Sequence, residues 1–259
     1  MLRFSRDEVD RERALIRNCA RLKYVAAALA ILLLALAGLP AHATAEYDYK
    51  KNERRIIDGG LAPNKKLAIS VGLARDKGPF FFLTAEPTHK IAARLQGIEP
   101  RLDTAPEALH AIWAPDSRHV AIIFRTERHE LAMWLYAVDG NRAESVAGPD
   151  VLDEVLKGKG LAMDDYTTRV HTIDISWQSN RRFHLAQQWL FSAPDRRLAQ
   201  ALGLYGKESP NDKFTSTGED GKPVIWTFVD IAADADCEIA PGNRYRVIAT
   251  KPGAFASRE

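Results

Sequence analysis

The chain has 259 residues and a formal net charge of +2, with 46% hydrophobic and 27% charged residues. This composition is that of a folded globular protein and excludes disordered and collagen-like chains. Outside the first 45 residues, basic and acidic side chains nearly balance. Nucleic-acid binders usually carry a clustered basic excess, so we expect no nucleic-acid partner.

Residues 1–45 have the pattern of a secretory leader. Basic side chains precede an uncharged apolar run at 24–39, and small residues follow it, which fits cleavage after Ala43 or Ala45. The run is about 16 residues long, shorter than the roughly 20 that cross a bilayer core. The alternative is an uncleaved membrane anchor. Cleavage predicts one domain at 46–259, exported to the periplasm or the extracellular space, without a membrane span.

The two cysteines divide between these parts. Cys19 lies in the leader and precedes the apolar run, so no lipid-modified N-terminus is implied. Cys237 alone remains in the exported part and cannot form an internal disulfide. Its neighbours are Asp236 and Glu238, which favour a raised thiol pKa and an inert side chain.

Short apolar runs separated by turn residues predict an all-β domain. The clearest segment is a meander, with a strand that ends at Trp113, a turn at 114–118, and strands at 119–124 and 131–138. Asp139 and Gly140 then form a tight-turn dipeptide. Further strands are expected at 67–73, 80–84, 170–177, 182–191, 224–231 and 245–249.

The remaining segments lack this pattern. Residues 149–169 predict a long acidic loop with one helical turn at 151–156, and residues 194–206 predict a short helix. A polar loop is expected at 207–222, and a frayed tail after Pro252.

A weak internal repeat runs through the chain. Trp113-Ala-Pro-Asp-Ser-Arg118, followed by an apolar strand, has counterparts that begin at Leu61 and at Trp177. The segment Trp113-Ala-Pro-Asp-Ser-Arg-His-Val-Ala resembles the Trp-Ser-Pro-Asp-Gly-x-x-Ile-Ala signature of TolB-type and prolyl-oligopeptidase-type β-propeller repeats. The similar region covers about residues 105–147. It departs from the signature at Ser117, where a glycine is usual.

The resemblance implies a propeller-like domain of antiparallel meanders. Propellers close with about four to eight blades, and the chain has room for three or four irregular ones, which leaves both a complete and an incomplete ring open. An open stack of meanders and an unrelated sandwich are the alternatives. An incomplete ring leaves sheet edges through which a second copy could associate.

Motifs for catalysis and metal binding are missing from the sequence. The histidines outside the leader have no compact metal-ligand spacing, and no nucleophile elbow or phosphate-binding loop occurs. The acidic pairs Asp153-Glu154 and Asp164-Asp165 indicate a solvated loop. The run from Asp230 to Glu238 lacks the spacing of a calcium loop. The sequence therefore assigns no catalytic residue and predicts neither a cofactor nor a metal.

Two functions remain open. The first is an exported, non-catalytic binding or protein-interaction module, whose partner we expect among envelope proteins. The second is an exported hydrolase whose carboxylates come from separate loops, which would require Asp116, Asp165, Asp174 and a histidine to meet in one cleft with shifted pKa values.

Overall fold

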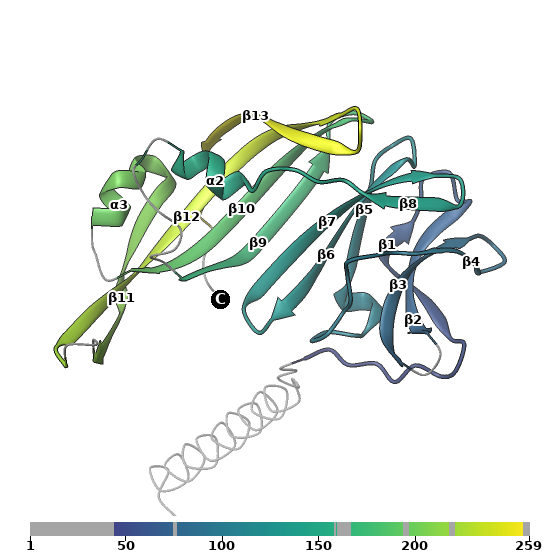
Figure 1. The fold of residues 1–259 in the computed structure, drawn as a ribbon, viewed down its shortest axis with the longest axis horizontal. Helices are drawn as coiled ribbons and strands as arrows, with labels where there is room; N and C mark the ends of the chain where they lie inside the picture. The colour runs from purple at the N-terminus through teal and green to yellow at the C-terminus, as the bar shows by residue number, and fades with distance from the viewer. Residues whose placement is uncertain are drawn as a thin grey trace, which may run out of the picture. The chain divides into compact units, whose positions relative to one another are not determined.

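The computed structural model of the protein describes residues 44–74, 77–157, 159, 167–193, 197–217 and 221–255. The expected leader at 1–45 lies outside these residues except for Thr44 and Ala45. The described residues belong to one unit, Thr44–Glu259, and most of them lie in antiparallel strands (Figure 1). The expectation of an all-β domain built from meanders is confirmed.

Two consecutive antiparallel meanders of four strands each form one eight-stranded sheet. They are joined by a parallel contact between their first strands, where Asp58 lies opposite His110. The first meander contains β1 (Arg54–Leu61), β2 (Leu67–Ala74), β3 (Lys77–Ala85) and β4 (Lys90–Arg94). The second contains β5 (His110–Trp113), β6 (His119–Glu127), β7 (Glu130–Asp139) and β8 (Arg142–Ser145).

The third meander belongs to a separate five-stranded sheet and carries an insertion. Its strands pair in the order β9, β10, β12, β13, and β11 pairs with the first half of the long β12. These strands are β9 (Thr167–Trp177), β10 (Arg182–Ala193), β11 (Gly206–Thr217), β12 (Pro223–Ala240) and β13 (Arg244–Pro252). Short helices lie at η1 (Pro106–Ala108), α2 (Val151–Leu156), α3 (Arg197–Leu202) and η3 (Gly203–Tyr205).

The turns after β1 and β5 have the same hydrogen bonds. Asn64 Oδ1 accepts from the Lys66 N–H, and Asp116 Oδ1 accepts from the Arg118 N–H, both at 2.9 Å. Lys65 and Ser117 occupy equivalent left-handed positions, with φ values of 58° and 61°. Such positions favour glycine, so Ser117 adopts the backbone conformation of the glycine that it replaces in the family signature.

A tryptophan links each later repeat to the repeat before it. The indole N–H of Trp113 donates to the Gly60 carbonyl at 2.9 Å, and that of Trp177 donates to the Ile112 carbonyl at 3.1 Å. Gly60 and Ile112 each directly precede the residue at the tryptophan position of their own repeat. The tryptophan positions of the second and third repeats are therefore equivalent in space, whereas the third turn, at 178–181, lacks the left-handed residue of the first two.

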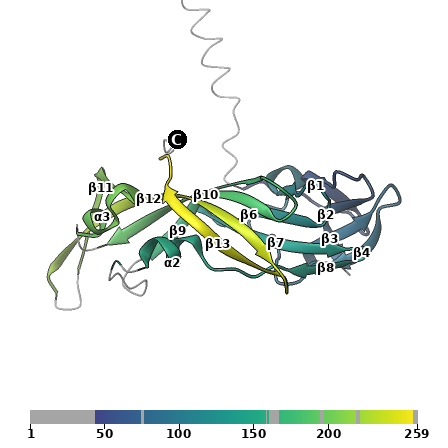
Figure 2. The same cartoon turned by 90° about the horizontal axis from the view of Figure 1, so that it is seen from above.

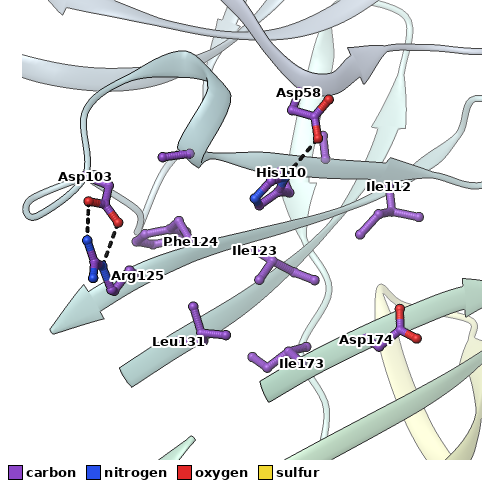
Figure 3. Close-up of a pocket in the computed structure, with 12 residues that line it drawn as sticks. Asp58, Asp103, His110, Ile112, Ile123, Phe124, Arg125, Leu131, Ile173 and Asp174 are labelled. Atoms are coloured by element: carbon purple, nitrogen blue, oxygen red, sulfur yellow. Dashed lines mark hydrogen bonds and ion pairs between the residues drawn. The ribbon is translucent and has the colours of Figure 1, made fainter. Parts of the chain in front are cut away.

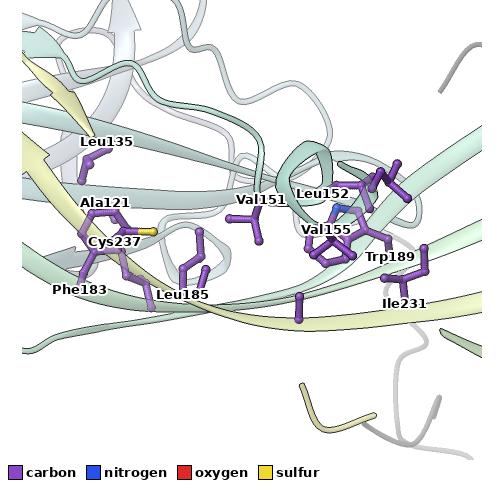
Figure 4. Packing of buried hydrophobic residues seen from close by; sticks show 14 of the residues in the cluster. Ala121, Leu135, Val151, Leu152, Val155, Phe183, Leu185, Trp189, Ile231 and Cys237 are labelled. Atoms are coloured by element: carbon purple, nitrogen blue, oxygen red, sulfur yellow. The ribbon is translucent and has the colours of Figure 1, made fainter. Parts of the chain in front are cut away.

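Two hydrophobic cores hold the three meanders together. One lies between the first two and includes Phe81 and Phe124, whose ring centroids are 5.5 Å apart. The other joins the second meander to the third and to α2, with Trp189 and Phe183 completely buried (Figure 4). The second meander thus lies between the other two, as Figures 1 and 2 also show.

Cys237 is part of the second core and is 1% exposed (Figure 4). Burial, with the nearby Asp236 carboxylate, raises the pKa of its thiol to about 12. The thiol is therefore protonated and unreactive at neutral pH, as its acidic neighbours suggested.

Three sequence expectations are wrong in detail. Residues 207–217, expected as a loop, belong to β11, because pairing with β12 stabilises a polar segment as a strand. The tail is not frayed at 253–255, since the Gly253 N–H donates to Ala232 and the Ala254 carbonyl accepts from Gln188. Strands β1, β4 and β8 were not expected at all. The helices expected at 151–156 and within 194–206 are present as α2 and α3.

None of the helices among the described residues is long and apolar enough to cross a membrane.

Candidate functional site

A cleft of about 520 Å³ opens where the first strands of the three meanders approach one another (Figure 3). Three of its polar residues occupy the same position in successive repeats. Asp58, His110 and Asp174 each lie three residues before the repeat position held by Leu61, Trp113 and Trp177. The repeat therefore places one ionisable side chain from each meander in a single cleft.

His110 and Asp58 form a direct contact inside this cleft. His110 Nδ1 lies 2.9 Å from Asp58 Oδ2, and the two side chains are 50% and 66% exposed. A polar contact between side chains that are so exposed contributes little to stability. The two groups are thus accessible to a ligand, and Asp174, on β9, adds a second exposed carboxylate (Figure 3).

The opposite wall carries a rigid charge pair. Arg125 donates from Nε and Nη2 to the two carboxylate oxygens of Asp103, at 2.7 and 2.6 Å. Asp103 is 5% exposed and also accepts from the Ala45 N–H at 2.8 Å. Burial works to raise the pKa of Asp103, but these hydrogen bonds together hold it below its usual value. Arg125 is therefore neutralised locally, and the free charge of the cleft comes from Asp58 and Asp174.

The floor of the cleft is apolar and continues into a second cavity. Leu131 and Ile173 line the first cleft and also a neighbouring cavity of about 320 Å³. Met133 and Val170 line the second cavity further along. The two form one groove between β7 and β9, with Asp58, His110 and Asp174 at one end, a hydrophobic middle, and the polar side chains of Asp150, Gln187 and Tyr245 in the second cavity.

The lining restricts the chemistry of the cleft. Its twelve lining residues include no serine, threonine, cysteine or lysine, so the side chains of nucleophile type in it are the carboxylates and His110. Among the described residues no group of three or more metal-ligating side chains is positioned to hold a metal ion. The arrangement fits recognition of a positively charged group, and the His110–Asp58 pair could also move a proton.

The structure brings together only part of the set that the hydrolase alternative needed. Asp174 lies in the cleft with a histidine, whereas Asp116 is bonded to the backbone of its own turn. Asp165 and the neighbouring Asp164 lie outside the described residues. Asp153 and Glu154 are in the first turn of α2.

The acidic residues of β12 and the basic residues near β6 have structural partners. Asp234 pairs with Lys251, Asp236 with His184, and Glu238 with two arginines. Arg125, near the end of β6, binds Asp103 as described above.

Sequence reasoning missed Asp58, His110 and Asp103 as site residues. The signal for the first two was the repeat itself, since the 52-residue spacing between Pro63 and Pro115 also relates Asp58 to His110. Asp103 gave no such signal, because it lies in a connection between repeats and its partners are distant in sequence.

No protein-family model and no curated protein matches the chain. Among solved structures it is similar to the crystal structure of TolB from Acinetobacter baumannii, with 13% sequence identity and a TM-score of 0.27. The match covers 76% of this chain and 41% of that one. TolB belongs to the family whose repeat residues 105–147 resemble.

Proposed function

We propose that the protein is an exported, non-catalytic interaction module that binds a partner in the cleft between its repeats. The observation that carries this proposal is the convergence of Asp58, His110 and Asp174 from equivalent positions in three meanders. An apolar floor beside exposed carboxylates is typical of a surface that recognises a side chain with a basic end. The leader-like residues 1–45 favour a partner in the cell envelope.

In the same proposal the three meanders are three blades of an incomplete β-propeller. The equivalent turns and the tryptophan contacts between successive repeats support this assignment. The four-stranded order of each meander is that of a propeller blade, with β11 as an insertion in the third. An open arc leaves the cleft accessible from the side that a complete ring would close.

Site-specific photocrosslinking in cells tests the binding function. A photoreactive phenylalanine analogue at Leu131 lies on the floor of the cleft, and the same analogue at the exposed Arg142 on β8 is the control. We expect a light-dependent adduct with one envelope protein from position 131 and not from position 142. Equal adducts from both positions, or none from either, would contradict the proposal.

A hydrolase is the second candidate, and the His110–Asp58 contact favours it. A histidine oriented by a carboxylate is the usual arrangement of a general base. Screening of ester, peptide and glycoside substrates with the wild type and His110→Gln tests it. Hydrolysis that disappears in the variant would replace the binding proposal, whereas no turnover in either would leave binding as the function.

A further inference from the structure

Strand β9 is an edge strand that lacks the usual protecting residues, although a bulge at His171 interrupts its ladder with β10. It has 11 residues, ends its sheet, and contains neither proline nor lysine; its charged residues are Arg169 and Asp174. Exposed edges of natural sheets are usually short, or carry lysine or proline, because a free row of backbone groups pairs readily with another strand.

The other outer strands of the two sheets do have such protection. β4 and β8 are only five and four residues long and carry charged residues. β11 contains the exposed Lys207, and β13 contains Lys251 and Pro252. Among the described strands, β9 is thus the one long edge that lacks both kinds of protecting residue.

The backbone register shows which groups of β9 point away from its sheet. The Gln178 N–H donates to the Arg182 carbonyl, and the ladder continues through the pairs Ser176–His184 and Asp174–Ala186. Bonded and non-bonded pairs alternate in an antiparallel ladder. The backbone N–H and C=O groups of Ile173 and Ile175 are therefore directed toward the free edge.

The groove described above runs along this edge. Ile173 lines both of its cavities, Asp174 lies in the first cleft, and Val170 lines the second cavity. A strand added to β9 would place alternate side chains toward Leu131 and Met133 on β7.

We propose that an extended peptide segment of a partner protein binds as an added strand along β9, with a lysine or arginine side chain between Asp58 and Asp174. This inference rests on the proposed function and names the class of its ligand. Backbone pairing would supply affinity, and the alternating side chains would supply specificity, as in other cases of strand addition. Because Arg125 is neutralised by Asp103, the free charge of the cleft favours a cation.

Fluorescence anisotropy with synthetic peptides tests this inference on the purified exported protein. The probe is a fluorescein-labelled peptide of about nine alternating threonines and valines with one central lysine. One matched peptide has glutamate at the centre. Another keeps the lysine but has N-methylated amides on alternate residues, which prevents strand pairing without changing the protein.

We expect the lysine peptide to bind at least about tenfold more tightly than either matched peptide. Asp174→Asn should reduce the preference for lysine over glutamate, while the control Asp139→Asn, at the exposed end of β7, should leave it unchanged. Hydrogen exchange should show new protection at the amides of Ile173 and Ile175 when the lysine peptide is bound.

Each contrary result overturns a defined part of the inference. Equal binding of the N-methylated peptide would exclude strand addition, and equal binding of the lysine and glutamate peptides would exclude charge recognition. If the protein is a dimer without peptide and the amides of Ile173 and Ile175 are already protected from exchange, then a second copy of the chain, and not a partner peptide, pairs with β9. Failure of every peptide to bind would overturn the inference, while an adduct from position 131 would still support the proposed function.

Discussion

The indole N–H of Trp177 reaches the backbone carbonyl of Ile112 at 3.1 Å, across the boundary between the third repeat and the second. Trp113 makes the same contact with Gly60 one repeat earlier. The repeats are therefore joined by a defined polar contact as well as by hydrophobic packing.

Replacing either tryptophan by phenylalanine should weaken the contact between neighbouring repeats. Trp113→Phe and Trp177→Phe each leave a carbonyl without its indole donor, and we expect a loss of about 1 kcal/mol in the free energy of unfolding. Urea unfolding measures this loss. Trp134→Phe is the control, since the indole N–H of Trp134 has no hydrogen-bond partner among the described residues. An equal loss in all three variants would assign the effect to packing alone.

Substitution by glycine at the two left-handed turn positions, 65 and 117, should change the stability of the protein by different amounts. Lys65 is exposed, so Lys65→Gly relieves an unfavourable φ of 58° without removing a contact. We expect a stabilisation of roughly 0.5–1 kcal/mol after the cost of glycine in the unfolded chain. Ser117→Gly also removes the hydroxyl that accepts from the Asn64 N–H, so its net effect should be near zero.

Thermal unfolding measures both glycine variants, with Lys65→Ala as the control that keeps the strain. Stabilisation by Lys65→Ala as large as that by glycine would show that the backbone conformation is not the cause.

Arg125→Met should leave the Asp103 carboxylate with a single remaining hydrogen-bond donor, the Ala45 N–H. We expect a destabilisation of about 2 kcal/mol near neutral pH, because a buried carboxylate loses its charged partner. The pKa of Asp103 is lowered in the folded protein, so this stabilisation exists above the unfolded pKa and disappears as the pH falls through the folded one. Urea unfolding should therefore show a smaller difference from wild type below about pH 4.

The double variant Asp103→Asn/Arg125→Met tests whether the pair acts as a unit. We expect it to be less destabilised than the two single losses added together. Strict additivity would contradict the coupling.

His119 should make the protein less stable in mild acid. Burial is the main cause of its lowered pKa; Arg181 and Arg118 add to the effect, and Asp116 opposes it. The unfolded chain then binds the proton more readily than the folded protein, so stability falls as the pH drops below the unfolded value of about 6.5. Urea unfolding at about pH 7.5 and about pH 5.5 should show a smaller acid effect in His119→Gln. An unchanged pH dependence would assign the effect to other groups.

Strands with a clear pattern of apolar and turn residues could be predicted from the sequence, whereas strands that depend on pairing with a distant segment could not. The strands around Trp113 have apolar runs and turn residues, and their positions were predictable. β11 has no such pattern, because it is polar and is stabilised by its pairing with β12. β1 was missed because its charged start and the irregular pairing between Ile56 and Leu61 hide its alternation.

The site was less predictable than the fold. Asp58, His110 and Asp174 differ in residue type, so a search for a repeated residue does not find them. Only the repeat register, applied three residues before Leu61, Trp113 and Trp177, relates the three positions. Sequence also gave no sign that Asp103 would meet Arg125, since that contact depends on the packing of the connection between two meanders.

The insertion of α3, η3 and β11 inside the third meander also has a consequence for the order of folding. The hairpins of the first two meanders join segments that are neighbours in the sequence. In the third meander, β10 pairs with β12, which follows only after the insertion. Arg182 on β10 and Glu238 on β12, which form a hydrogen bond, are 56 residues apart. Closing a long loop costs more chain entropy than closing a short one, and distant contacts form more slowly. The third meander is therefore expected to assemble last, so a newly synthesised chain would acquire its β9 edge and the complete cleft only in the final step.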